Sequence, residues 1–476
     1  MTSPNKILEQ CEPDADVLLD NFRKDISCEV LNKFKALGIT LKNLMDLQLV
    51  IPVVYPWDKE YDELKYNVNR RFIVFPWAIA MCKTTKHVEI AVDWCYNRNV
   101  PLIARSGSHC FENFSLINGM IIDQSRRTDI QVLEKDNIAI VESGCLLGPT
   151  QLELSKHELA LVGGTCCNVA CSGLSLGGGI GFLARKYGLA SDNLLEAEVV
   201  LYNGKTVKAN CKENTDLFWA LRGAGNCNYG IVTEFVFKVY KIPTVTIFDL
   251  IFPYNQMKEV IDVWQRWAPF TDENLTSECD VYNNRVLVTG QYIGCKKDLE
   301  KLLLPIFKLC PKECNIKTVS FIDACRHFTS KPWHPFFKNK SGFVKQFLPS
   351  NAIDIIHKYM KCGGDQDHVE LNAFGKNINK VPSNKTAFPH REGTLFWCHL
   401  QCHWSNQEHS KKKLKWINNF YNEIEPYLSG AYANAPDIDL IDPLEKYYGD
   451  NLSRLMEIKR KYDPENVFKY AQSVPV

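Results

Sequence analysis

The stretch from Gly163 to Asn193 constrains the fold of this chain more than any other. It holds eight of the 26 glycines and three of the 19 cysteines in the 476-residue sequence. Because glycine has no Cβ atom, successive backbone N–H groups can turn there toward one bound anion or ring system. The stretch therefore predicts a backbone that closely approaches a tightly held ligand.

A dinucleotide-binding fingerprint is the first alternative for this stretch. Gly179-Ile-Gly181-Phe-Leu-Ala184 fits G-x-G-x-x-A, and Glu196 and Glu198 follow at a tolerable distance. The motif is persuasive only after a buried strand of a βαβ unit. The preceding residues, Ser-Gly-Leu-Ser-Leu-Gly-Gly, are not such a strand. A glycine-rich loop without a ligand is the second alternative.

A second motif, Arg105-Ser-Gly-Ser-His109, lies 57 residues upstream of Cys166. It follows two short apolar runs at 78–81 and 101–105, and between them apolar residues recur at the spacing of one buried helix face. A third apolar run, at 72–75, predicts a further strand. Strand, helix and strand place the motif in a loop after a parallel strand, where α/β folds bind ligands. The loop N–H groups, with Arg105 nearby, are expected to hold a phosphate.

The remaining sequence divides into two patterns. Hairpins are predicted at 130–141 and 197–208, the second around an Asn-Gly turn. From Pro243 to about Ile441, spaced strands alternate with helices, which favours an antiparallel sheet covered on one face. A helix over 444–462 is expected to return to the first domain.

Together the two motifs resemble those of the berberine bridge enzyme-like flavoproteins of the vanillyl-alcohol oxidase superfamily. Two further segments are similar to that family, 216–233 and the C-terminal Tyr-Tyr-Gly region from Tyr447 onward, so the resemblance covers roughly residues 60–476. It implies an α+β, two-domain flavoprotein with a vanillyl-alcohol oxidase-type FAD-binding domain and an α+β substrate domain with an antiparallel sheet. The implied division is an N-terminal arm (1–60), the FAD-binding domain (61–242), the substrate domain (243–441) and a C-terminal segment returning to the FAD domain (442–476).

The resemblance also implies FAD bonded covalently at two points, His109 on the 8α-methyl and Cys166 on C6. Four family positions are altered near these residues, at Ser108, Cys167, Asn168 and Ala170, and Asn113 replaces a further glycine, so attachment through His109 alone stays open. The other implied cofactor-binding residues are Arg105, Ser106, Gly107, Ser108, Gly164, Thr165, Val169, Gly173, Gly177, Gly178, Gly179, Gly181, Gly230, Ile231 and Val232.

Three candidates for the catalytic base follow. Strand alternation places Trp397, His399, Gln401 and His403 on one face, and His399 is the first candidate because an ordinary histidine side chain titrates near neutrality. By resemblance, Tyr447 or Tyr448 of the Tyr-Tyr-Gly motif is the second candidate, although a phenol needs its pKa lowered before it is a useful base. Glu370 or Asn372 on a neighbouring strand is the implied partner.

The expected activity is that of an oxidase that moves a hydride from an alcohol carbon of a sugar or secondary metabolite to flavin, and then to oxygen, giving hydrogen peroxide. The resemblance makes Val169 the residue that admits oxygen. A dehydrogenase or oxidative cyclase with another electron acceptor, and a catalytically idle flavoprotein, remain alternatives.

Composition narrows the partners. The net charge is +1 and no window holds eighteen apolar residues, which excludes nucleic acid and a membrane as expected partners. The start of the chain shows no secretion signal, so 19 cysteines suggest thiols in a cytoplasm-like reducing compartment. No metal site is expected, because strand alternation splits the Cys398–His403 set between two faces. A monomer or homodimer is expected.

Overall fold

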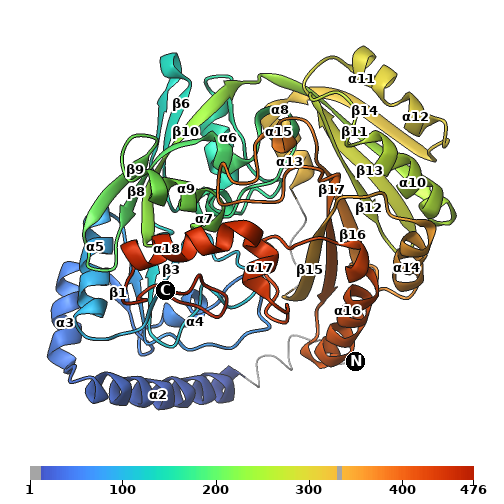
Figure 1. The fold of residues 1–476 in the computed structure, drawn as a ribbon. Helices are drawn as coiled ribbons and strands as arrows, with labels where there is room; N and C mark the ends of the chain where they lie inside the picture. Colours follow the sequence, from blue (N-terminus) through green and yellow to red (C-terminus); the bar gives the residue numbers. More distant parts are fainter. Residues whose placement is uncertain (1–11, 330–334) are drawn as a thin grey trace.

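The first sheet carries the strand-helix-strand unit that the sequence predicts. The computed structural model describes residues 12–329 and 335–476, and Figure 1 shows their arrangement. β2 (Ala78–Met81), β4 (Met120–Asp123) and β3 (Leu102–Arg105) are parallel, and β1 (Val53–Val54) pairs antiparallel with β2. α5 (Thr85–Tyr96) begins at Thr84, whose side chain accepts from the His87 N–H. The unit ends in the loop that carries His109.

The second sheet is antiparallel and is organised around its longest strand, β10 (Ile231–Lys241). β10 pairs with β6, β7 and β8, and both predicted hairpins, β5–β6 and β8–β9, belong to this sheet. The other strands are β5 (Ile130–Leu133), β6 (Ile138–Glu142), β7 (Leu159–Leu161), β8 (Leu194–Val200) and β9 (Thr206–Asn210).

The glycine-rich stretch follows α6 (Leu147–Ser155) and β7 as loops around two short helices, α7 (Cys171–Leu176) and α8 (Ala184–Tyr187). Gly178 and Gly179 have φ values of +133° and +86°, which side-chain-bearing residues rarely adopt. Gly178 and Gly179 are therefore needed for the backbone conformation of this turn. α9 (Thr215–Ala224) packs against α7 and completes this part of the first domain.

The second domain is built on a seven-stranded sheet in which every pair of neighbours is antiparallel. Its order is β14 (Glu313–Ser320), β11 (Thr244–Pro253), β13 (Arg285–Tyr292), β12 (Leu275–Val281), β16 (His368–Ala373), β17 (Phe396–Trp404) and β15 (Phe336–Val344). α10 (Met257–Trp267), α14 (Ser350–Lys361) and α16 (Ser410–Ile424) cover its outer face (Figure 1). The antiparallel sheet covered on one face is therefore confirmed.

The two ends of the chain pack on the first domain. α2 (Glu12–Ala36) and α3 (Leu41–Val50) lie beside the first sheet, where the Phe34 ring contacts Trp77 and Trp94. The expected helix over 444–462 is divided at Gly449 into α17 (Pro443–Tyr448) and α18 (Leu452–Tyr462). Phe468 then forms a parallel bridge with Leu102 of β3.

The prediction of a strand at 72–75 is wrong, because this run has no β-bridge partner and Ile73 is 64% exposed. The remaining short helices are α4 (Tyr61–Leu64), α11 (Lys296–Leu302), α12 (Leu304–Phe307), α13 (Phe321–Phe328) and α15 (Asn377–Lys380).

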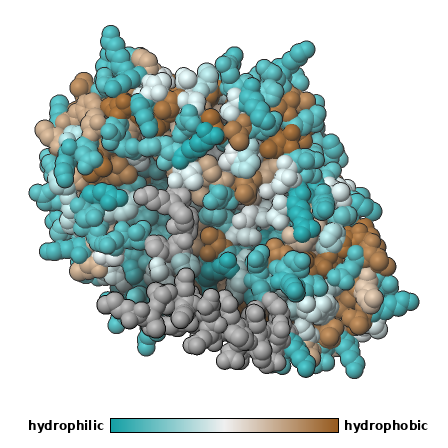
Figure 2. Space-filling view, turned by 180° about the vertical axis from the view of Figure 1, so that it is seen from behind, coloured by the Kyte–Doolittle hydropathy of each residue, from teal (hydrophilic) through white to brown (hydrophobic). Residues whose placement is uncertain are grey.

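Hydrophilic side chains cover most of the face seen in Figure 2, and apolar ones gather in separate patches. On α3, Leu41, Met45 and Leu49 form an exposed apolar stripe. Among the described residues, no helix is both long enough and apolar enough to cross a bilayer.

A buried network of charges joins the two domains. Lys338 Nζ of β15 lies 2.6 Å from Glu112 Oε1, in the loop after His109, and 2.5 Å from Asp437 Oδ1 of the C-terminal region. Lys340 Nζ contacts the second Asp437 oxygen at 2.6 Å, and Arg71 contacts Glu112 at 2.5 Å. Each buried charge therefore has a partner of opposite sign, as desolvated ions require.

Lys338→Met should destabilise the protein by about 3–5 kcal/mol, because it leaves Glu112 and Asp437 without their shared buried cation. Thermal unfolding followed by circular dichroism measures the loss. Lys358→Met is the matched control, since its pair with Glu423 is exposed and is worth at most about 1 kcal/mol. Equal effects of the two variants would contradict the role given to the network.

Candidate active site

A cavity of about 990 Å³ lies between the two domains. Loops of the first domain form one wall, and the inner faces of β12, β16 and β17 form the other. Its size is at the upper end of the range for small-molecule and cofactor sites.

His109 and Cys166 meet in the wall of this cavity. Cys166 Sγ lies 3.9 Å from His109 Nε2, although the residues are 57 positions apart in the sequence. Burial lowers the pKa of His109 to about 4, so its imidazole is neutral near pH 7. A neutral imidazole and a thiol thus converge on one side of the cavity, and both are nucleophiles.

Most of the predicted cofactor-binding residues line the cavity with them. These are Arg105, Ser106, Gly107, Ser108, Gly164, Thr165, Val169, Gly173, Gly230, Ile231 and Val232. Gly177, Gly178, Gly179 and Gly181 are not in the lining. A Cβ at Gly177 would lie 2.0 Å from Asn434 Oδ1, and one at Gly181 would lie 2.0 Å from the Gly163 carbonyl oxygen. These glycines permit close backbone packing behind the wall.

Arg105, which is expected near a phosphate held by the loop N–H groups, is paired with a carboxylate in the structure. Its Nε is 2.6 Å from Asp123 Oδ2, and both side chains are buried. The pair compensates the guanidinium charge, yet Nη1 has no hydrogen-bond partner among the described residues. Gln124 also lines the cavity, and its Oε1 likewise has no hydrogen-bond partner among the described residues. Such buried polar atoms call for a partner that a bound ligand can supply.

His399 stands at the centre of the opposite wall. The cavity is lined by Trp397, His399, Gln401 and His403, as strand alternation predicts, whereas Cys398 faces the buried core. His399 Nδ1 lies 3.2 Å from Gln401 Nε2 and 3.6 Å from Glu370 Oε2. His399 is 4% exposed, and its Nε2 has no partner in the part of the chain that the structure describes. A buried nitrogen without a partner calls for one, which a bound substrate would supply.

Glu370 belongs to a row of titratable groups across three strands. Asp280 of β12, Glu370 of β16 and His399 of β17 are directly opposite one another in the sheet register. Burial would raise the pKa of Glu370, but the His399 imidazole holds it below its usual range. Burial and the Glu370 charge raise the pKa of Asp280 and of Glu278. The wall therefore combines one carboxyl group whose pKa is lowered with two whose pKa values are raised.

Tyr447 and Tyr448, the second candidates for the base, also line the cavity. Tyr447 Oη accepts from the Asp437 N–H and donates to Gln472 Oε1. Burial is the main cause that raises the pKa of both tyrosines well above the ordinary value. Neither is prepared to lose a proton near pH 7.

The sequence reasoning missed Tyr432, Asn434, Glu278 and Asp280, all of which line the cavity. Tyr432 Oη accepts from the Gly179 N–H at 2.8 Å and from Asn434 Nδ2 at 3.0 Å, and burial raises its pKa to about 12. The alternation Glu278-Cys-Asp280-Val-Tyr282 was a visible signal of one polar strand face. Tyr432 and Asn434 lie outside any strand or helix, so no periodicity marks them.

The site has the features of a flavin pocket: a glycine-containing cradle, unpartnered polar atoms, and a histidine and a cysteine at one end. Gly107 is part of that cradle, since a Cβ there would lie 2.8 Å from the Ala170 nitrogen. Within the described residues, no group of three His, Cys, Asp or Glu side chains is placed to hold a metal ion. Fold and site together define the class of FAD-linked oxidoreductases.

Comparisons with known proteins agree with this class. The FAD binding domain model matches residues 76–210, and the model described as berberine and berberine like matches residues 431–475. YgaK of Bacillus subtilis (strain 168), an FAD-linked oxidoreductase, is 35% identical, with 88% of this chain and 95% of YgaK covered. Berberine bridge enzyme-like 3 of Arabidopsis thaliana is 30% identical, with 84% and 83% covered.

Among solved structures, the xylooligosaccharide oxidase from Myceliophthora thermophila C1, in complex with xylobiose, superposes with a TM-score of 0.84. It is 26% identical, and the match covers 91% of this chain and 98% of the oxidase. The chain belongs to the berberine bridge enzyme-like family of FAD-linked oxidoreductases.

Ser108→Gly should raise the free energy of unfolding by about 0.5–1 kcal/mol. Ser108 has a φ of +53°, a strained value for an L residue, and the strain relieved exceeds the added flexibility of the unfolded chain. Urea unfolding measures the change. Ser106→Gly is the control, because Ser106 does not have a positive φ. This variant should lose about 0.5–1 kcal/mol of unfolding free energy through the added flexibility of its unfolded chain. A loss in both variants would contradict the argument.

Proposed function

We propose that this protein is an oxidase that moves a hydride from an alcohol carbon of a sugar or oligosaccharide to FAD, and that FAD is bonded to both His109 and Cys166. The observation that carries the proposal is the 3.9 Å approach of Cys166 Sγ to His109 Nε2 at one end of the cavity. The other end is the polar face of the substrate-domain sheet. The two nucleophiles thus lie where one ring edge can meet both of them.

The polar wall supports a substrate rich in hydroxyl groups. The Gln401 amide both donates and accepts hydrogen bonds, and the carboxyl groups of Glu278, Asp280 and Glu370 offer acceptor oxygens. Trp397 adds an aromatic surface beside them, and its Nε1 has no partner among the described residues. The solved xylooligosaccharide oxidase, which holds xylobiose, has the same fold.

His399 is the base in this proposal. When bound, the flavin supplies the hydride acceptor. His399 Nε2 takes the hydroxyl proton of the substrate in the tautomer that carries its hydrogen on Nδ1, which faces Glu370 Oε2 at 3.6 Å, and Gln401 Nε2 donates to the same carboxylate oxygen at 2.6 Å. The negative charge of Glu370 stabilises the imidazolium that forms, and Trp397 packs on the imidazole with ring centroids 4.4 Å apart. Tyr447 and Tyr448 are assigned a structural role in the pocket wall, because their raised pKa values disfavour loss of a proton.

Oxygen is the proposed final electron acceptor. Val169 lines the cavity three residues after Cys166, and its side chain is small enough to leave room for oxygen there. A dehydrogenase with another acceptor is the outcome if peroxide is absent during turnover.

Acid-precipitated wild-type protein should stay yellow, because its flavin is covalently bound. His109→Ala and Cys166→Ala should each retain flavin through the remaining bond, and the double variant should release it. Absorbance of pellet and supernatant measures the distribution. Cys171→Ser, a buried thiol outside the cavity lining, is the control and should behave as wild type. A colourless wild-type pellet would exclude covalent attachment.

His399→Gln should slow anaerobic flavin reduction by a substrate by about 10²–10⁴-fold, because general base catalysis contributes that much. Stopped-flow bleaching of flavin absorbance, with xylobiose among the sugars tested, measures the rate. His409→Gln, an exposed histidine, is the control and should leave the rate unchanged. An unaltered rate in His399→Gln would return the role of base to a tyrosine.

A further inference from the structure

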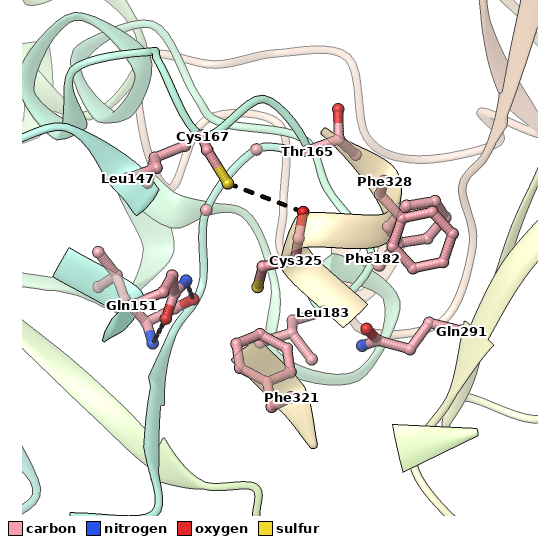
Figure 3. A pocket seen from close by; sticks show the side chains of 13 residues that line it. Leu147, Gln151, Thr165, Cys167, Phe182, Leu183, Gln291, Phe321, Cys325 and Phe328 are labelled. Atoms are coloured by element: carbon pink, nitrogen blue, oxygen red, sulfur yellow. Dashed lines mark hydrogen bonds between the residues drawn. The ribbon is translucent and has the colours of Figure 1, made fainter. Parts of the chain in front are cut away.

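Two cysteines outside the proposed reaction line a second, smaller cavity. Cys167 directly follows Cys166, and Cys325 lies on α13 of the substrate domain. Both line a cavity of about 30 Å³, which has room for a molecule the size of water or hydrogen peroxide. Figure 3 shows the Cys167 sulfur directed toward the Cys325 backbone of α13, while the Cys325 sulfur points away from it in this view.

Close contacts hold Cys167 against α13. Its Sγ lies 3.7 Å from the carbonyl oxygen of Cys325. Thr329 Oγ1, at the end of α13, is 2.7 Å from Cys167 Sγ and 2.8 Å from the same carbonyl oxygen. Both cysteines are half-buried free thiols. These contacts place Cys167 Sγ against the backbone of Cys325, and the Cys325 side chain must rotate for the two sulfur atoms to meet.

We propose that Cys167 and Cys325 form a reversible disulfide in response to hydrogen peroxide, and that this bond lowers turnover. The Cys167 sulfur attacks one peroxide oxygen, which gives a sulfenic acid and one water. The Cys325 sulfur then attacks the Cys167 sulfur, the S–S bond forms, and the second water leaves. Two thiols lose two hydrogens and two electrons in total, and peroxide is reduced to two waters.

The order of attack follows from the surroundings of Cys325. Burial, and then the neighbouring Cys167, raise the pKa of the Cys325 thiol to about 12, which disfavours its thiolate as the first nucleophile. Cys325 is therefore the resolving thiol. Its attack completes a link between the two domains that spans 158 positions of sequence.

The bond would act on the site through the backbone. Cys167 is the residue directly after Cys166 in the chain. Phe328 and Thr329, at the end of α13, line the large cavity. Drawing Cys167 toward the Cys325 sulfur moves the loop that places Cys166 beside His109. A displacement of about 1 Å in such a site costs on the order of ten- to a hundredfold in rate.

Peptide mapping tests the link. The full chain, reduced and freed of reductant, is exposed to graded hydrogen peroxide, alkylated and digested without reduction. A peptide pair joined through Cys167 and Cys325 should appear before the exposed Cys295 and Cys310 are consumed, and dithiothreitol should remove it. Because peroxide is added, the outcome does not depend on the proposed oxidase activity. Loss of the exposed thiols first, or a Cys166–Cys167 pair instead, would overturn the proposal.

The rate of anaerobic flavin bleaching by xylobiose, or by another sugar that reduces the flavin, tests the effect of the link. Peroxide should slow the wild-type protein by on the order of tenfold, and dithiothreitol should restore it. Cys325→Ser and Cys325→Ala should keep the untreated rate and lose the response, which guards against a folding defect in either one. An equal peroxide response in these variants would show that the pair is not the switch.

Discussion

The pairing of Lys338 with Glu112 and Asp437 is the interaction on which the site depends. Glu112 lies three residues after His109, Lys338 is in the substrate-domain sheet, and Asp437 precedes the C-terminal helices. Removing these ions from water costs several kcal/mol each, so only an arrangement that pairs all of them is stable. That requirement selects one docking of the domains. The charges join the loop after His109, in one wall of the cavity, to the sheet that forms the other wall.

The substrate-domain sheet has two faces of opposite character. On β17, Cys398, Leu400 and Cys402 join the apolar core beneath the outer helices. Trp397, His399 and Gln401 of the same strand point into the cavity between the two domains. The apolar face anchors the strand, and the fixed register places Asp280, Glu370 and His399 in one row. A rigid sheet therefore positions the proposed base better than a loop would.

The sequence predicted much of this arrangement where local patterns carry the information. Strand alternation placed His399 on the correct face, and the spacing of α5 placed His109 after a parallel strand. It did not predict the pairing of Arg105 with Asp123 or the structural use of the Tyr447 phenol, because those contacts join residues distant in sequence. The run at 72–75 looked like a strand, yet its apolar side chains have no strand beside them. Strand formation there depended on a partner that the fold does not supply.

The C-terminal segment has a consequence for how the chain reaches its native state during synthesis. Phe468 is fully buried beside β3, and Lys459 donates to the backbone carbonyl of Asn228 in the first domain. The domain that leaves the ribosome first therefore stays incomplete until the final residues emerge. A nascent chain interrupted after the substrate domain would expose an apolar groove and become a ready target for chaperones and proteases.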